Sequence, residues 1–248
     1  MYDEKVPIYA GETVDDLILG DMRIIQPEKG YRFSLDAVLL AHFPEPPWQH
    51  VIELGAGSGV ISLLMAYRDP QARFTSLEIQ PAVAERAARS VALNGIEDRI
   101  EILNADIREA ENLLPTGEAE LVVSNPPFWR RGEGKVSTNP EEALARHEIS
   151  LTLNELIQKG AYLLRPGGKM AIIHQSKRLD EALEIFRRYN VPARRIRTVH
   201  SFINQPARLV LIEAVKNRPG PLAVMPPLII YTHPGLYSPE IKSIYADG

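Results

Sequence analysis

Residues 53–59 read Glu-Leu-Gly-Ala-Gly-Ser-Gly and join an apolar run at 51–54 to a helical pattern that begins at Val60. Glycines in such a turn let the backbone bend sharply and approach a ligand, which then rests on the helix N-terminus, where N–H groups point outward. The spacing is G-x-G-x-G, so the third glycine of the dinucleotide fingerprint would have to stand at position 60, which is valine. This stretch predicts a strand, a ligand-binding turn and a helix, and it disfavours NAD as the ligand.

From residue 51 to about 215, short apolar runs alternate with amphipathic helical segments, the pattern of a parallel sheet covered on both faces. The expected strands and helices, in chain order, lie at 51–54, 60–68, 74–77, 81–94, 100–103, 107–113, 121–123, 151–164, 170–173, 179–189, 194–200 and 208–215. Only about seven residues join the last two strands, which is too short for a parallel crossover. The sequence therefore predicts an α/β, Rossmann-like fold with a seven-stranded, mostly parallel sheet and an antiparallel last strand.

The chain is expected to have three parts. Residues 1–47 hold two short β runs, 16–19 and 22–25, on either side of a two-residue turn, and a helix follows them. This hairpin and helix should pack on the main domain, residues 48–215. Residues 216–248 form a Pro-rich C-terminal extension with one strand-like run and a final short helix.

The composition excludes several classes of protein. None of the 248 residues is cysteine, which excludes disulfides, a thiolate nucleophile and any zinc or iron–sulfur site with cysteine ligands. The histidines show no spacing typical of a zinc pair, so no metal is expected. The acidic start lacks the basic-then-apolar order of a signal peptide, and no stretch approaches the roughly 18 uncharged apolar residues of a membrane helix. We expect a soluble, cytoplasmic protein.

The net charge of −4 conceals an uneven distribution. Residues 1–124 hold 10 Lys and Arg against 21 Asp and Glu, a net charge of −11, whereas residues 125–248 hold 18 against 11, a net charge of +7. Such an asymmetry points to an anionic partner for the basic half, although unevenly placed surface loops produce it as well.

Carboxylates stand at the ends of three consecutive expected strands. Glu53 ends the first strand and can contact the ammonium of an amino-acid-like ligand. Glu78 ends the second strand and can accept both ribose hydroxyls of a nucleoside, with Ile79 beside it to flank an adenine. Asp106 follows the third strand and can accept from an adenine amino group. Because the carboxyl ends of parallel strands meet at one edge, these residues outline an adenosine-sized crevice together with Gly55, Gly57 and Gly59.

The fourth expected strand ends in Ser-Asn-Pro-Pro-Phe, residues 124–128. The consecutive prolines Pro126 and Pro127 hold the backbone extended and leave carbonyl groups unpaired. Asn125 Oδ1 and the Pro126 carbonyl can accept the two hydrogens of a planar NH2 group, while Phe128 stacks on the ring that carries it. Accepting both hydrogens localises the nitrogen lone pair and aims it. We therefore expect this motif to hold a planar amine or amide as substrate.

The glycine stretch and the Asn-Pro-Pro-Phe motif together resemble the class I S-adenosylmethionine-dependent methyltransferases that methylate exocyclic or amide nitrogens. The likeness covers residues 51–215 and implies a Rossmann-like class I methyltransferase fold. Two further segments, Gly-Tyr-Arg-Phe-Ser-Leu-Asp-Ala-Val-Leu-Leu at 30–40 and Ala-Arg-His-Glu at 145–148, are similar to the bacterial tRNA adenine-N6 methyltransferase group, which acts beside the anticodon of a valine tRNA.

The resemblance implies methyl donation from S-adenosyl-L-methionine to N6 of an adenine in tRNA. It implies that the glycine loop, Glu78 and Asp106 hold the cofactor, that Asn125 to Phe128 hold the target base, and that Asp36 closes over the methionine part of the cofactor. The target nucleotide must be flipped out or lie in a loop to reach such a pocket. Phosphate contacts are expected from residues that follow the motif: Arg130, Arg131, Lys135, Arg146 and His147.

Other functions stay open on the sequence. Phe128 stands where the tRNA group more often has tyrosine, and phenylalanine also occurs in similar rRNA guanine-N2 methyltransferases. A protein glutamine-N5 methyltransferase would use the same pocket, because Asn-Pro-Pro-Phe can hold any planar NH2 group. Val60 disfavours an NAD-dependent oxidoreductase, and the presence of both pocket motifs disfavours a non-catalytic RNA-binding module.

Overall fold

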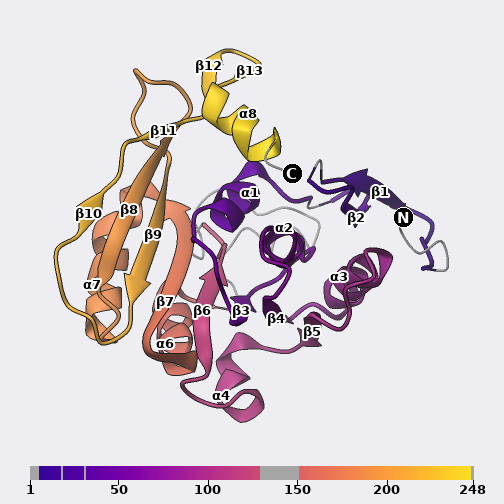
Figure 1. Ribbon diagram of the computed structural model, residues 1–248, viewed down its shortest axis with the longest axis horizontal. Coiled ribbons are helices and arrows are strands. Elements are labelled where there is room, and N and C mark those ends of the chain that lie inside the picture. The colour runs from indigo at the N-terminus through magenta and orange to yellow at the C-terminus, as the bar shows by residue number, and fades with distance from the viewer. Residues whose placement is uncertain (1–5, 18, 31, 129–150, 247–248) are drawn as a thin grey trace.

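The structure is a computed structural model that describes residues 6–17, 19–30, 32–128 and 151–246. Its centre is a twisted sheet with helices on both faces (Figure 1). Seven strands form the body of the sheet, and in their order across it they are β8 (Ala193–His200), β9 (Leu209–Val215), β7 (Leu164–Gln175), β6 (Ala119–Ser124), β3 (His50–Leu54), β4 (Arg73–Glu78) and β5 (Ile100–Asn104). The two-residue strands β10 (Ala223–Val224) and β11 (Leu228–Ile229) add to the outer side of β8.

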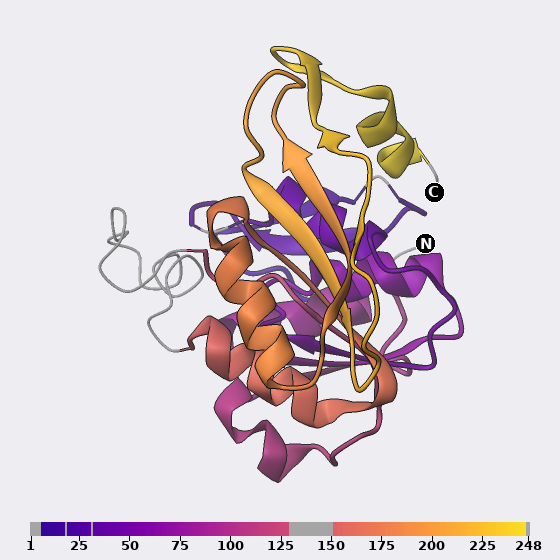
Figure 2. The ribbon, with the colours of Figure 1, turned by 90° about the vertical axis from the view of Figure 1, so that its left-hand side faces the viewer.

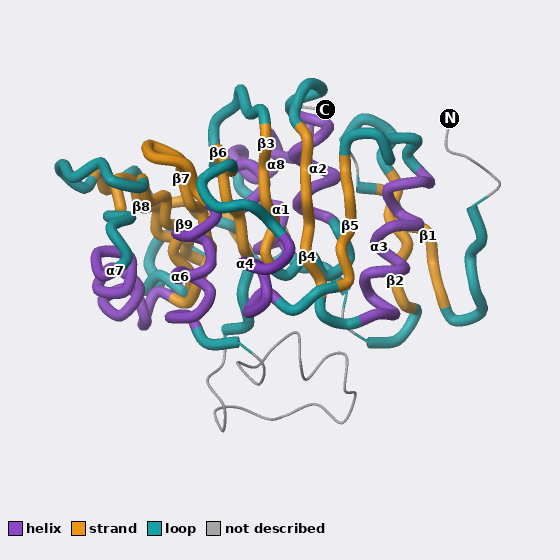
Figure 3. The backbone as a smooth tube through the Cα atoms, turned by 90° about the horizontal axis from the view of Figure 1, so that it is seen from below, coloured by secondary structure: helices purple, strands orange, loops and turns teal. Residues whose placement is uncertain are grey.

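The strand directions confirm the expected topology. β3 pairs in parallel with β4 and β6, and the parallel run continues to β5 on one side and β7 on the other. Figure 3 shows β6, β3, β4 and β5 lying side by side. The last of the seven, β9, is antiparallel to both of its neighbours, β7 and β8. The short strands β10 and β11 were not expected as part of this sheet.

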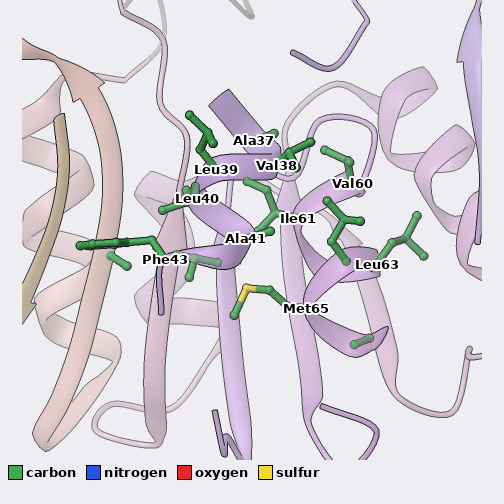
Figure 4. Packing of buried hydrophobic residues seen from close by; sticks show 14 of the residues in the cluster. Ala37, Val38, Leu39, Leu40, Ala41, Phe43, Val60, Ile61, Leu63 and Met65 are labelled. Atoms are coloured by element: carbon green, nitrogen blue, oxygen red, sulfur yellow. The ribbon is translucent and has the colours of Figure 1, made fainter. Parts of the chain in front are cut away.

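Two hydrophobic cores cover the two faces of the sheet, because successive side chains of a strand point to opposite sides. Val51 and Leu121 pack in the core that holds α1 (Leu35–His42), α2 (Val60–Arg68) and part of α3 (Pro81–Leu93). Figure 4 shows the α1 and α2 side chains of this core. Their neighbours Ile52 and Val122 pack in the core on the other face. The helices on that face are α4 (Ala110–Leu113), which follows the 3-10 turn η1 (Ile107–Glu109), α6 (Leu153–Leu163) and α7 (Leu179–Arg188).

The N-terminal hairpin forms, but its strands lie further from the turn than the sequence predicts. β1 (Glu12–Asp16) and β2 (Arg23–Pro27) pair antiparallel, and both residues of the Gly20-Asp21 turn have positive φ, as a type I′ turn requires. The prediction of a strand at 16–19 was wrong, because the strand ends at Asp16; beyond it the Leu17 amide still donates to the Met22 carbonyl at 2.9 Å, while Leu17 and Leu19 are buried in the core.

The hairpin is held on α3 by a cluster of charges. The Arg89 guanidinium donates to both carboxylate oxygens of Glu12, at 2.7 and 2.8 Å, and Arg86 Nε donates to the same carboxylate at 3.2 Å. The hydrogen bonds from Arg89 lower the pKa of Glu12 to about 2. The hairpin therefore depends on an ionised, half-buried carboxylate.

The C-terminal extension lies along the outer edge of the sheet and beyond it (Figure 2). After β11 it forms a small hairpin of β12 (Tyr231–His233) and β13 (Leu236–Tyr237), and then helix α8 (Pro239–Ala246). Ile241 of α8 is fully buried in the core that also holds α1 and α2. In the described ranges, no helix combines the length and the apolar character needed to cross a bilayer.

We expect Glu12→Gln to lower the free energy of unfolding at pH 7 by about 1–2 kcal/mol, since it removes charge-assisted hydrogen bonds to Arg89. Because the folded-state pKa of Glu12 is lowered, this contribution is present above about pH 4.5 and is lost as the pH falls toward 2. Urea unfolding of both proteins at pH 7 and pH 3 measures it, with Glu28→Gln, an exposed position, as the control. An equal loss at both pH values would contradict the assignment.

Candidate active site

The central strands end at one edge of the sheet, and a cavity opens there. β3 lies between β4 and β6: β4 and β5 extend the sheet on one side of β3, and β6 and β7 extend it on the other. Open α/β sheets bind ligands at the point where the strand order reverses in this way. We call this the glycine-loop cavity; residues that line it include Gly55, Gly57, Glu78, Ile79, Asp106, Asn125 and Pro126. Residues from the ends of β3, β4, β5 and β6 thus meet, as the sequence predicts.

The glycine loop between β3 and α2 is held against the neighbouring strand. The amides of Gly55 and Ala56 both donate to the Leu77 carbonyl, each at 2.9 Å. Gly55, Gly57 and Gly59 all have positive φ, between 53° and 80°, which glycine adopts without strain. A Cβ built on Gly57 would meet nothing within 4 Å, so the absence of a side chain there leaves open space beside the loop.

Glu78 ties the loop to the end of β4. Its Oε2 accepts from the Gly57 amide and its Oε1 from the Gln80 amide, both at 2.9 Å. The carboxylate lines the glycine-loop cavity although the residue is only 6% exposed. Ile79, beside it, is 39% exposed and lines the same cavity.

Asp106 reaches the cavity from the end of β5. Its carboxylate accepts from the Arg108 amide at 2.9 Å, capping η1, and pairs with the Arg108 guanidinium. Arg108 lowers the pKa of Asp106, so the group is a carboxylate at neutral pH. Glu78 and Asp106 therefore place two hydrogen-bond acceptors around one cavity.

Glu53 is not brought into the glycine-loop cavity. The residue is fully buried, and its Oε2 accepts from Ser62 of α2 and, at 3.2 Å, from Ser76 of β4. Its Oε1 has no hydrogen-bond partner in the described part of the chain. Burial raises the pKa of Glu53 to about 7. The expected contact with a ligand ammonium does not follow from this position, because the β3 pleat directs the side chain toward α2.

A second cavity adjoins the first at the end of β6. We call it the target cavity; it is lined by residues that include Asp36, Asn125, Pro126, Phe128, Gln175 and Arg208. Asn125 and Pro126 line both cavities. Asn125 Oδ1 is buried and has no hydrogen-bond partner among the described residues. An unpaired buried acceptor is costly, and a donor on a bound ligand would satisfy it.

Asp36 lies in the target cavity, at the start of α1, and is not among the residues of the glycine-loop cavity. Burial raises its pKa, while a Ser34 hydrogen bond and the charge of Arg208 oppose that effect. The five basic candidates Arg130, Arg131, Lys135, Arg146 and His147 lie outside the described residues.

His174 and Gln175, at the end of β7, are parts of the site that sequence reasoning missed. The rings of His174 and Phe128 lie 5.7 Å apart and are tilted by 54°. Burial lowers the pKa of His174 to about 4, so the ring is neutral at physiological pH and supports Phe128 as a packing partner. The feature of the sequence that could have identified these two residues is their position at the end of β7, the strand that pairs with β6.

The two cavities together can hold two ligands that meet at Asn125 and Pro126. One cavity offers acceptors and an apolar side chain suited to a nucleoside. The other offers Asn125 Oδ1, which has no partner in the described ranges, and an aromatic ring suited to a planar amine. Across the described ranges, no cluster of three or more His, Asp or Glu side chains could hold a metal ion.

Comparison with known proteins gives consistent matches. A family model described as "Methyltransferase small domain" matches residues 35–197. A "tRNA1(Val) (adenine(37)-N6)-methyltransferase" from Porphyromonas gingivalis is 34% identical over 84% of this chain and 85% of its own. One of the same name from Photobacterium profundum is 28% identical over 76% and 79%.

Among solved structures, a predicted O-methyltransferase from Agrobacterium tumefaciens has a TM-score of 0.68 at 23% identity, covering 85% of this chain and 95% of its own. A geranyl diphosphate C-methyltransferase from Streptomyces coelicolor, solved with S-adenosyl-L-homocysteine, has a TM-score of 0.53 at 14% identity, covering 73% and 78%. These likenesses confirm the expected class I methyltransferase fold.

Glu53→Gln tests the buried carboxyl group. Because the folded-state pKa of Glu53 is raised, this carboxyl group ionises at a lower pH in the unfolded chain than in the folded protein. The wild type therefore loses stability as the pH rises from about 4.5 to 7. Glutamine cannot ionise, so the variant should gain roughly 2–3 kcal/mol relative to wild type on going from pH 5 to pH 8. Urea unfolding at both pH values measures this, with exposed Glu101→Gln as the control. A pH-independent difference would refute the raised pKa.

Proposed function

Because this chain belongs to the methyltransferase small domain family, we propose that it transfers a methyl group from S-adenosyl-L-methionine to N6 of an adenine in tRNA. The proposed substrate nucleotide is adenine 37 of a valine tRNA, which the names of the curated relatives specify for those proteins. Membership in this family also makes the NAD-dependent oxidoreductase the weaker alternative.

One observation carries the proposal: at the junction of the two cavities Asn125 Oδ1 is buried and, among the described residues, has no hydrogen-bond partner. A group that satisfies it must carry an N–H or O–H and must lie beside whatever fills the glycine-loop cavity. An exocyclic amino group of a flipped-out base meets both conditions.

The residues of the glycine-loop cavity fit S-adenosyl-L-methionine. The open space at Gly57 admits a ligand against the loop, and Glu78 and Asp106 supply acceptors for hydroxyl and amino hydrogens. When bound, the cofactor supplies an activated methyl group on a sulfonium. We assign its adenosine part to Glu78, Ile79 and Asp106, as the fingerprint of nucleoside-binding crevices suggests.

The chain's own contribution to the reaction is positioning. Asn125 Oδ1 and the Pro126 carbonyl would accept the two amino hydrogens, while Phe128, backed by the neutral His174 ring, would stack on the base. With both hydrogens held, the nitrogen lone pair points in one direction, and transfer to it then depends on alignment. Arg130, Arg131, Lys135, Arg146 and His147 remain the candidates for phosphate contacts.

The alternatives are an rRNA guanine-N2 and a protein glutamine-N5 methyltransferase, which would use the same acceptors. The experiment that separates them is incubation of the protein with labelled cofactor and unmodified total RNA or release factors, followed by mass-spectrometric identification of the methylated product. N6-methyladenosine in tRNA is expected. Methyl groups in guanosine or only in protein would overturn the proposal.

Asn125→Ala should abolish methyl transfer, since one of the two acceptors that orient the amino group is removed, and should leave the affinity for S-adenosylhomocysteine nearly unchanged. Initial rates on unmodified tRNA and calorimetric titration of the cofactor product measure the two effects. Asn112→Ala, the same change at an exposed position of α4, is the matched control. Near-normal turnover in the Asn125 variant would refute the assigned role.

A further inference from the structure

The turn between β8 and β9, residues 201–208, forms part of the wall of the target cavity. Ser201, Ala207 and Arg208 line that cavity together with Asn125 and Phe128. The position follows from the sheet, since β9 begins at Leu209, which pairs with the last residue of β7. A ligand in the target cavity therefore lies beside this turn.

The turn is held in one conformation by hydrogen bonds at both of its ends. The Arg208 amide donates to the Val199 carbonyl at 2.9 Å, and the Ser176 amide donates to the Arg208 carbonyl at 3.0 Å. Within the turn, the Gln205 amide donates to the Phe202 carbonyl at 3.0 Å, and the His200 Nδ1 donates to the Gln205 carbonyl at 2.7 Å. The side chains of the turn are thus presented by a preorganised backbone.

The C-terminal extension lies beside the turn and is hydrogen-bonded to it (Figure 2). The Tyr231 amide donates to the Ser201 carbonyl at 3.0 Å, and Ile230 lines the target cavity. The rings of Phe202 and Tyr231 are 5.7 Å apart, and Tyr231 stacks on Tyr237 at 5.3 Å with an angle of 12°. Aromatic side chains of the extension thereby pack against the turn.

The turn carries an exposed apolar side chain and an exposed cation. Ile203 is 75% exposed at its tip. The exposed Arg208 guanidinium makes no ion pair or hydrogen bond with any described residue, and its charge acts on Asp36, which lines the same cavity. An isolated exposed isoleucine has no special meaning, but here it stands on a hydrogen-bonded turn that also contributes Arg208 to the lining of the target cavity.

We propose that residues 201–208 are a docking surface for the RNA strand next to the target nucleotide, with Ile203 and Phe202 against an unstacked base and Arg208 on a phosphate. The inference rests on the proposed function, because a base in the target cavity brings its neighbours close to this turn. Single-stranded RNA offers the flat apolar face and the negative charge that these side chains match.

Ile203→Asp tests the apolar contact and carries little folding risk at such an exposed position. We expect the dissociation constant for an unmodified anticodon stem-loop, measured by fluorescence anisotropy with S-adenosylhomocysteine present, to rise about tenfold. Val224→Asp is the matched control, since Val224 is 69% exposed and lies on β10, opposite residue 196 of β8. Equal effects of the two variants would overturn the proposal.

Arg208→Gln tests the phosphate contact independently. It should weaken binding about fivefold and reduce the slope of log affinity against log salt by about 1. Arg187→Gln, the same loss of charge at an exposed position of α7, should leave the slope unchanged. An unchanged slope for the Arg208 variant would remove this residue from the interface.

The outcomes distinguish this proposal from the proposed function. A wild-type protein that methylates tRNA while both turn variants bind RNA normally refutes the docking surface alone. A wild-type protein that binds the stem-loop through this turn but yields no methylated nucleoside refutes the function and keeps the surface. A wild-type protein that binds no RNA refutes both.

Discussion

Parallel pairing of β3 with both β4 and β6 is the constraint on which the site depends. It brings the carboxyl ends of three strands to one edge, and the hydrogen bonds from Gly55 and Ala56 to the Leu77 carbonyl then fix the glycine loop against its neighbour. Glu78 completes the arrangement by accepting from the same loop. A shift in the register of these strands would separate the residues of the site, which lie close together only because of that register.

The parts of the site that the sequence predicts are those set by local structure. The glycine loop, Glu78 and the Asn125 motif lie where a strand ends, and strand ends can be recognised from hydrophobic pattern and turn residues. Glu53 could not be placed in this way, because the side of the sheet that it faces depends on the register with Ser76. The burial of Glu53 follows from the pleat of β3 and not from its place in the glycine motif.

Long-range contacts account for the remaining differences. Asp36 belongs to a helix whose docking on β7 and α2 no local pattern specifies, and it lies in the target cavity. His174 becomes part of the site only through its contact with Phe128 across neighbouring strands. The two-residue strands β10 and β11 form because they pair with β8. Segments this short have too few residues for a hydrophobic pattern to predict them.

The two cavities share a wall, and this has a thermodynamic consequence. Asn125 and Pro126 line both, so a ligand in either cavity contacts residues that form the other. The binding free energies of two ligands are coupled whenever one of them changes the shape or mobility of a common wall, and the coupling is equal in both directions. The backbone of Pro126, which is held extended by its ring, limits how far that wall can move. Its stiffness thus limits the part of this coupling that passes through movement of the shared wall, and leaves the part that comes from direct contact between the two ligands.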